Sequence, residues 1–208
     1  MIIPNSVNTL IFDLGGVIYN IDINLGISNF KKLGFKEADQ FVGTYAHHDF
    51  FVRWETGKIS IAEFRDEIRK RSNQKITDEE IDYAWGAVLK DIPKERIDLL
   101  LQLRKKYRLF LLSNTNPYHT EICTKNELAK YGLSLNALFD RCFLSYQMGI
   151  AKPNPEIFLK LLQCSGIKAE ECLFLDDGQK NIDTAAQLGF HTYLVKQGEN
   201  LDFLINNK

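Results

Sequence analysis

The feature that most constrains the fold is an apolar run near the N-terminus that stops at an acid and two glycines. The run, Val7 to Phe12, contains β-branched and aromatic residues and predicts a strand buried on both faces of a sheet. Asp13 follows it, and the chain then turns at Gly15 and Gly16. Open α/β sheets bind ligands at the carboxyl ends of their strands, so Asp13 is expected at such an edge. These residues would also suit an ordinary turn, so the interpretation needs support from elsewhere in the chain.

The second half of the chain repeats the pattern of a short apolar run followed by polar residues. It predicts four more strands, at Leu109–Leu112, Cys142–Leu144, Cys172–Leu175 and Thr192–Val195. Predicted helices lie between them, including one from about Tyr118 to Tyr131 and one from about Asn181 to Leu188. Strands that alternate with helices indicate parallel βαβ units. We therefore expect an α/β fold with a Rossmann-like, doubly wound parallel sheet of at least five strands.

Between the first and second predicted strands, the periodicity is that of helices. Three sets of apolar residues recur at helical spacing: Ile27, Phe30 and Leu33; Ile61, Phe64 and Ile68; and Ile81, Ala84, Trp85, Val88 and Leu89. Ser60 and the capping box of Thr77 and Glu80 favour helix starts. We predict a core domain of residues 1–19 and 91–208, and a small α-helical cap of residues 20–90 inserted after the first strand. Hinges are expected near residues 19–22 and 90–93, so that the cap can close over the sheet edge.

Composition narrows the possible partners. The formal net charge is −1, and neither a basic block nor a strongly amphipathic stretch suggests nucleic acid or a membrane surface. Apolar runs reach only about strand length, which is too short to span a bilayer, and no signal peptide is visible. The four cysteines show no C-x-x-C pairing, so reduced thiols in a cytoplasmic protein are the expectation. We expect a monomer or weak dimer that acts on a small molecule.

Polar groups follow four of the predicted strands: Asp13, Ser113, the loop that contains Lys152, and the pair Asp176 and Asp177. Each has a simple structural explanation on its own, such as a helix cap or a turn. In a parallel sheet, however, all four would lie at the same edge. Carboxylates brought together there would repel one another unless a cation were bound, and Mg²⁺ is held in this way by a few carboxylates and several waters. A phosphate group could contact both the metal and the lysine.

Four ordered motifs carry a resemblance to the haloacid dehalogenase superfamily, across nearly the whole chain. The matching segments are Phe-Asp13-Leu-Gly-Gly-Val, Leu-Leu-Ser113-Asn-Thr-Asn, Lys152-Pro-Asn-Pro-Glu-Ile-Phe and Phe-Leu-Asp176-Asp177-Gly-Gln-Lys-Asn181. The helical insertion resembles the first class of cap in this superfamily. The segment from Glu55 to Ser60, together with Trp85, resembles the subgroup that contains bacterial α-glucose-1-phosphate phosphatase and the N-terminal domain of some epoxide hydrolases.

The resemblance implies a role for each motif. Asp13 would attack phosphorus and form an aspartyl-phosphate. Mg²⁺ would be held by Asp13, the backbone carbonyl of Gly15 and Asp177, with Asp176 beside them or acting through water. The phosphoryl oxygens would be bound by Ser113 and the backbone amide of Asn114. Lys152 would offset the negative charge, as phosphoryl transfer requires.

Gly15 departs from the family pattern, in which an Asp two residues after the nucleophile is the general acid and then the base. The metal contact is expected to survive because it uses a carbonyl, but the proton donor is lost. General acid–base catalysis is worth about 10²–10⁴ in rate. Good leaving groups need it least, which favours sugar-1-phosphates. Asp22, just past the turn, is a possible replacement, although it also suits the cap of a helix, and His47 and His48 are weaker candidates.

Three functions are therefore open. The first is a Mg²⁺-dependent phosphatase of a small metabolite, a hexose-1-phosphate above all. The second is a non-catalytic binding or regulatory protein that keeps the fold, which Gly15 alone favours. The third is a metal-independent haloacid dehalogenase, whose site would not contain the pair Asp176 and Asp177.

Overall fold

Five parallel strands form one central sheet in the computed structural model, which describes residues 3–41 and 49–205. The strands are β1 (Thr9–Phe12), β2 (Arg108–Ser113), β3 (Arg141–Leu144), β4 (Cys172–Asp176) and β5 (His191–Leu194). Their order across the sheet is β3-β2-β1-β4-β5, with β1 in the centre. The expected doubly wound parallel sheet is therefore confirmed, and each of the five predicted strands is present to within about two residues at its ends.

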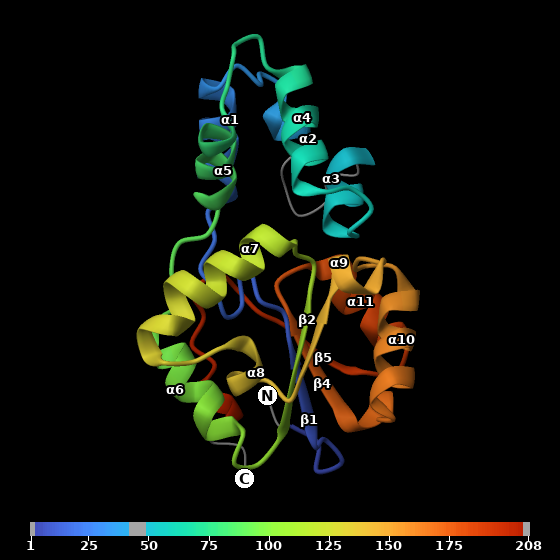
Figure 1. Ribbon diagram of the computed structural model, residues 1–208. Coiled ribbons are helices and arrows are strands. Elements are labelled where there is room, and N and C mark those ends of the chain that lie inside the picture. Colours follow the sequence, from blue (N-terminus) through green and yellow to red (C-terminus); the bar gives the residue numbers. More distant parts are fainter. Residues whose placement is uncertain (1–2, 42–48, 206–208) are drawn as a thin grey trace.

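Helices cover both faces of the sheet. Successive residues of a strand point to opposite sides, so a strand that is apolar throughout has two faces to bury. Leu10 and Phe12 of β1 pack into one hydrophobic cluster, and Ile11 packs into another. Figure 1 views the sheet nearly edge-on, with α6 (Lys94–Leu103) and α8 (Leu135–Leu138) on one side. On the other side lie α10 (Pro155–Ser165) and α11 (Gln179–Gln187). The remaining core helices are α7 (Pro117–Ile122), α9 (Ser145–Met148) and the short turns η3 (Ala169–Glu171) and η4 (Asp202–Leu204).

The segment predicted as one helix from about Tyr118 to Tyr131 changes its helix type twice. It consists of α7, a π-helical turn η1 (Cys123–Glu127) and a 3-10 turn η2 (Leu128–Tyr131). Gly132 follows with φ +67° and ends the segment in the left-handed conformation that glycine adopts easily. Apolar periodicity does not distinguish these helix types over so short a stretch, and π turns are frequent near functional sites.

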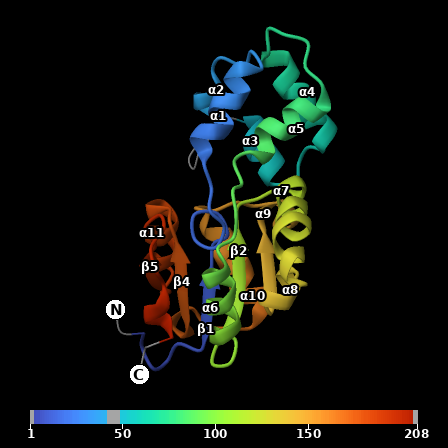
Figure 2. The same cartoon turned by 90° about the vertical axis from the view of Figure 1, so that its left-hand side faces the viewer.

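The regular elements that the structure describes between β1 and α6 are all helices. The helices are α1 (Ile23–Lys32), α2 (Ala38–Phe41), α3 (Asp49–Glu55), α4 (Ile61–Arg71) and α5 (Asp78–Gly86). Ser60 is the N-cap predicted for it and also forms a capping box with Glu63, and Thr77 forms the predicted capping box with Glu80. These helices bury their own aromatic cluster, around Phe30, Trp54 and Phe64. In both views they stand as a separate group beyond the carboxyl ends of the strands (Figures 1 and 2). This separate cluster supports the assignment of residues 20–90 to a cap. The assignment and its boundaries stay a prediction.

Two connecting segments run side by side between the helical group and the sheet. The Asn20 amide donates to the Asp91 carbonyl at 2.9 Å, and the Lys90 amide donates back to the Asn20 carbonyl at 2.9 Å. Next to them, Ile21 and Leu89 form an antiparallel bridge. The two expected hinges are thus joined by main-chain hydrogen bonds, so a movement of the cap would have to bend them together.

Among the described helices, none is both long and apolar enough to cross a membrane.

Candidate active site

The acid after β1 lies where the sequence predicted it, at the carboxyl edge of the sheet. The Asp13 amide donates to the Leu175 carbonyl of β4 at 2.9 Å, which continues the parallel ladder by one residue. The Asp13 carboxylate accepts a hydrogen bond from the Leu14 amide at 2.7 Å, so its orientation is fixed from its own turn. Its side chain is 13% exposed and lines a cavity.

The two glycines after Asp13 have different constraints. Gly16 has φ +76°, which favours glycine, and a Cβ there would lie 2.1 Å from an oxygen of Asp177, so a side chain would displace that carboxylate. Gly15 has no positive φ, and a Cβ there would contact only Ile21 at 3.5 Å, which is an ordinary van der Waals distance. Gly15 is therefore not required by the turn, and the lack of an acidic side chain there is a chemical difference rather than a steric one.

Lys152 neutralises two of the acids at the strand ends. Its Nζ lies 3.0 Å from an Asp13 oxygen and 2.6 Å from an Asp176 oxygen, and the Lys152 side chain is 1% exposed. It also donates to the Leu112 carbonyl at 2.9 Å. Burial lowers the pKa of Lys152, but the two neighbouring carboxylates outweigh that effect and raise it overall. Lys152 therefore stays charged in the site.

Asn114 holds the loop that presents this lysine. Its side-chain amide donates to the Lys152 carbonyl at 2.8 Å, and its side-chain oxygen accepts from the Lys152 amide at 2.8 Å. The side chain is thus engaged, while the resemblance assigned phosphate binding to the backbone amide of Asn114. Ser113 lines the same cavity, at the end of β2.

Asp176 and Asp177 are adjacent in sequence but differ in their surroundings. The Asp176 carboxylate is completely buried, and besides Lys152 it accepts from the Gly178 amide at 2.7 Å and from the Asn181 side chain at 2.8 Å. Within the described parts of the chain, Asp177 makes no such set of contacts, and it lines the cavity. Sequence reasoning placed Asn181 only within a motif, and the structure gives it the role of holding Asp176.

The three acids approach closely enough to share a cation. Asp13, Asp176 and Asp177 each offer a carboxylate oxygen, and these oxygens lie within 4.8 Å of one another. Burial raises the pKa of Asp13; Lys152 opposes this shift, and the two neighbouring acids add to it. Burial and then Asp176 raise the pKa of Asp177. The carboxylates thus repel one another where they stand, which a bound cation would relieve.

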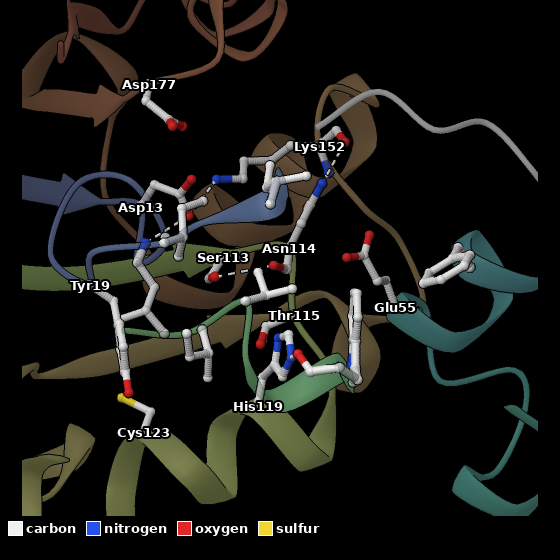
Figure 3. A pocket seen from close by; sticks show the side chains of 18 of the residues that line it. Asp13, Tyr19, Glu55, Ser113, Asn114, Thr115, His119, Cys123, Lys152 and Asp177 are labelled. Carbon is white, nitrogen blue, oxygen red and sulfur yellow. Dashed lines mark hydrogen bonds and ion pairs between the residues drawn. The ribbon is translucent and has the colours of Figure 1, made fainter. Parts of the chain in front are cut away.

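A cavity of about 160 Å³ opens from Asp13 toward the helices of residues 20–90 (Figure 3). Phe51, Glu55 and Trp85 line it from that side. Burial raises the pKa of Glu55 to about 7, although Lys152 opposes the shift. Sequence reasoning noted the Glu55 segment and Trp85 as marks of a subgroup and assigned neither a role in the site.

His119 of α7 also lines the cavity and was not predicted. Asn116 caps this helix and accepts from the His119 amide at 2.9 Å, which places the ring in the first turn. The ring stacks on Trp85, with 4.4 Å between centroids, and its Nε2 lies 3.0 Å from the Trp85 carbonyl. Burial lowers the pKa of His119 to about 4, so the ring is neutral near pH 7. With Nε2 donating to the carbonyl, Nδ1 is left as an acceptor.

The candidates that the sequence offered for the proton donor are Asp22, His47 and His48. Asp22 is the N-cap of α1, where it accepts from the Leu25 amide at 3.0 Å, and it is not among the described residues that line this cavity. Its position thus agrees with the capping role considered beside the catalytic one. His47 and His48 lie outside the described residues.

Comparison with known proteins identifies the family. The model of the haloacid dehalogenase-like hydrolases matches residues 7–189. The chain belongs to this hydrolase family. The resemblance read from the four motifs is thereby confirmed, and the fold agrees with that of solved members.

Several relatives in this hydrolase family match over almost their whole length. D-ribitol-5-phosphate phosphatase of Bacteroides thetaiotaomicron is 37% identical over 192 residues, which cover 92% of this chain and 93% of that protein. A wild-type family enzyme from the same species, crystallised with magnesium and inorganic phosphate, is 40% identical with a TM-score of 0.88, over 95% of this chain and 98% of that one. A predicted family hydrolase from Porphyromonas gingivalis is 37% identical with a TM-score of 0.88, over 97% of each chain.

Proposed function

We propose that this hydrolase is a Mg²⁺-dependent phosphatase that acts on a small phosphorylated metabolite through an aspartyl-phosphate. One observation carries the proposal: Asp13, Asp176 and Asp177 converge within 4.8 Å, and Lys152 pairs with the first two beside the cavity that Asp13, Asp177 and Lys152 line. Such a site combines a nucleophile, oxygen ligands for a hard cation and a fixed positive charge. Phosphoryl transfer needs these parts, because it depends on positioning and on charge neutralisation.

The donor set fits Mg²⁺, which prefers carboxylate and carbonyl oxygens. Asp13, Asp177 and the Gly15 carbonyl would hold the ion. Asp176 would stay beside it, because its two oxygens already accept from Gly178, Asn181 and Lys152. The absence of a Cβ at Gly16 keeps the space that Asp177 needs to reach the site. When bound, the ion would neutralise charge on the phosphoryl oxygens. The magnesium and phosphate complex of the relative at 40% identity supports this assignment.

The chain's own residues then have separable roles. Asp13 attacks phosphorus, and its orientation is fixed by the Leu14 amide. Ser113 and the Asn114 amide bind the phosphoryl oxygens at the end of β2. Lys152 offsets the negative charge that Asp13 and the phosphoryl group share, and Asn114 holds its loop in place. The helices of residues 20–90 would exclude water while the ester is bound.

The substrate class we propose first is a phosphate monoester of a small polyol. The cavity of about 160 Å³ suits a small molecule. His119 Nδ1 is an acceptor suited to a hydroxyl group. The relative named D-ribitol-5-phosphate phosphatase, with 37% identity over 92% of this chain, supports the same class. Hexose-1-phosphates are the second candidate, because Gly15 favours substrates with a good leaving group.

The two other functions considered from the sequence have less support. An L-2-haloacid dehalogenase shares the fold at a TM-score of 0.61, but at 15% identity that likeness concerns the fold alone. A purely binding role would leave the buried charge of Lys152, paired with Asp13 and Asp176, without a chemical purpose.

The test is phosphate release by the purified protein from a panel of pentitol phosphates, hexose-1-phosphates, hexose-6-phosphates and 2-haloacids. We expect Mg²⁺-dependent turnover that is abolished by a chelator and restored by Mg²⁺, with a pentitol 5-phosphate among the best substrates. Release of halide without added metal would instead support a dehalogenase. Binding of phosphate esters without any turnover would support the non-catalytic alternative.

A further inference from the structure

Glu55 is the acid of this cavity that the roles above leave unused. It is the last residue of α3 and lines the cavity from the cap side. Figure 3 shows Ser113 and Asn114 between Asp13 on one side of the cavity and Glu55 on the other. Its carboxylate makes no hydrogen bond to any other residue within the described parts of the chain, unlike Asp176. A carboxylate that faces a cavity without a protein partner is available to a ligand.

The backbone at Glu55 is tied to the loop that would bind phosphate. The Ser145 hydroxyl donates to the Glu55 carbonyl at 2.6 Å, and it accepts from the Thr115 amide at 2.9 Å. Two residues later, Gly57 packs so closely that a Cβ there would lie 2.3 Å from the Tyr146 carbonyl oxygen. The Ser145 hydroxyl therefore fixes the backbone of Glu55 to the core and also orients the loop after Ser113.

This position suits the leaving group of the proposed reaction. In phosphoryl transfer, the attacking and leaving oxygens lie roughly in line at phosphorus. With Asp13 attacking from the sheet edge, the leaving oxygen points away from Asp13 and toward the cap. Glu55 is on that side. Asp22, the earlier candidate, instead caps α1.

We propose that Glu55 donates the proton to the leaving oxygen, in place of the acid that Gly15 lacks. This inference rests on the proposed phosphatase function and names its proton donor. Burial supports it, because a pKa of about 7 leaves a substantial protonated fraction at neutral pH.

The proton balance closes over both halves of the reaction. As the bond from Asp13 to phosphorus forms and the ester bond breaks, protonated Glu55 gives its proton to the departing alkoxide, which leaves as an alcohol. Glu55, now a carboxylate, takes a proton from the water that attacks the aspartyl-phosphate. Inorganic phosphate leaves, and Asp13 and protonated Glu55 are regenerated.

The experiment compares Glu55→Gln with the wild type on two substrates, a pentitol 5-phosphate and p-nitrophenyl phosphate. The alkyl ester has a poor leaving group that needs a proton, and the aryl ester has a good one that does not. We expect kcat/KM for the alkyl ester to fall by about 10²–10⁴-fold, mainly through kcat, and the aryl ester to lose far less. Glu37→Gln is the matched control, since it makes the same change at an exposed position of residues 20–90. It should leave the ratio of the two rates unchanged.

A double variant separates proton donation from hydroxyl binding. Gly15→Asp returns an acid to the usual position, and the backbone there accepts a Cβ. In the Glu55→Gln background, it should restore much of the alkyl ester rate if the missing function is a proton. An increase in KM alone in Glu55→Gln, or a ratio equal to that of the wild type, would overturn the inference while leaving the phosphatase function standing. So would a steeper leaving-group dependence in Asp22→Asn than in Glu55→Gln. Failure of the wild type on all phosphate esters would instead refute the proposed function.

The wild type provides a second measurement that does not depend on a variant's folding. The other ionisable side chains that line the cavity are Asp13, Tyr19, His119, Cys123, Lys152 and Asp177. Asp13, Lys152 and Asp177 serve both substrates, so their titration cancels in the ratio of alkyl to aryl kcat/KM. His119, whose pKa is lowered to about 4, and Tyr19 and Cys123, whose pKa values are raised, titrate outside the range near pH 7. That ratio should fall as the pH rises through about 7, where Glu55 loses its proton. A ratio that stays constant across this range would also overturn the inference.

Discussion

Lys152 and Asp176 form an ion pair in which Nζ and Oδ2 lie 2.6 Å apart and both side chains are almost completely buried. The same Nζ lies 3.0 Å from Asp13, so one buried cation serves two acids on neighbouring strands. Breaking such a pair from one side leaves a buried charge without compensation, which typically costs about 3–5 kcal/mol. The proposed catalytic site at this edge of the sheet and the stability of the fold are therefore linked through Lys152.

Replacing Lys152 with Met should both destabilise the fold and abolish activity. The free energy of unfolding in the absence of metal should fall by about 3–5 kcal/mol, because Asp13 and Asp176 lose their shared partner. Added Mg²⁺ should recover part of this stability but none of the activity, since the charge that faces the phosphoryl group is gone. Denaturant unfolding with and without Mg²⁺ measures the first effect. Normal turnover in this variant would contradict the assignment.

Asp13→Asn should abolish turnover and leave the fold intact. The amide has nearly the volume of the carboxylate but cannot act as the nucleophile, and Lys152 keeps its pair with Asp176. The measurement is phosphate release, with circular dichroism and denaturant unfolding to show that the protein is folded. Substantial activity that persists at saturating substrate would exclude Asp13 as the nucleophile.

Asp177→Asn should lose activity mainly through weaker Mg²⁺ binding. Asp177 lines the cavity and makes no ion pair with Lys152, so its loss should disturb the fold little. Raising the Mg²⁺ concentration should restore part of the rate in this variant and none of it in Asp13→Asn. Measuring the rate of each variant as a function of Mg²⁺ concentration distinguishes these outcomes. If Asp177→Asn and the wild type depended equally on Mg²⁺, Asp177 would not be a ligand.

The two glycines after Asp13 should respond in opposite ways to a side chain. Gly15→Ala should fold with a stability close to that of the wild type, because its Cβ would meet Ile21 only at 3.5 Å. Gly16→Ala should lose stability and activity together, because its φ is +76° and its Cβ would collide with Asp177. Thermal unfolding of the pair tests this contrast. Equal effects at both positions would show that the turn differs from the one described.

Stability should fall as the pH drops from about 6.5 toward 4, through His119. The pKa of His119 is lowered to about 4 in the fold, against an ordinary value of 6.5. Between these values the unfolded chain binds a proton that the folded chain does not, so acidification favours unfolding. His119→Phe keeps a ring stacked on Trp85 and removes this titration. The difference in unfolding free energy between wild type and variant should change with pH only in that window, and a difference independent of pH would refute the assignment.

The sequence by itself determined the sheet, the helical insertion and the acids at the strand edges. A buried parallel strand has a continuous apolar run, and its end is marked by the first polar residue, so Asp13, Ser113 and Asp176 could be placed at one edge from local pattern alone. The capping boxes at Ser60 and Thr77 were equally local, since they depend on residues three apart.

Only the tertiary structure decided what faces these acids. Glu55 lies forty-two positions from Asp13 and His119 more than a hundred, and the packing of the helices of residues 20–90 against the core encloses both in one cavity. Their pKa values depend on burial, which comes from that packing and not from neighbours in sequence. Asp22 shows the converse: its closeness to Asp13 in sequence suggested a catalytic role, but its carboxylate accepts a hydrogen bond from the Leu25 amide at the start of α1. The direction of a side chain depends mainly on the helix, strand or turn that carries it, and much less on its distance along the chain from another residue.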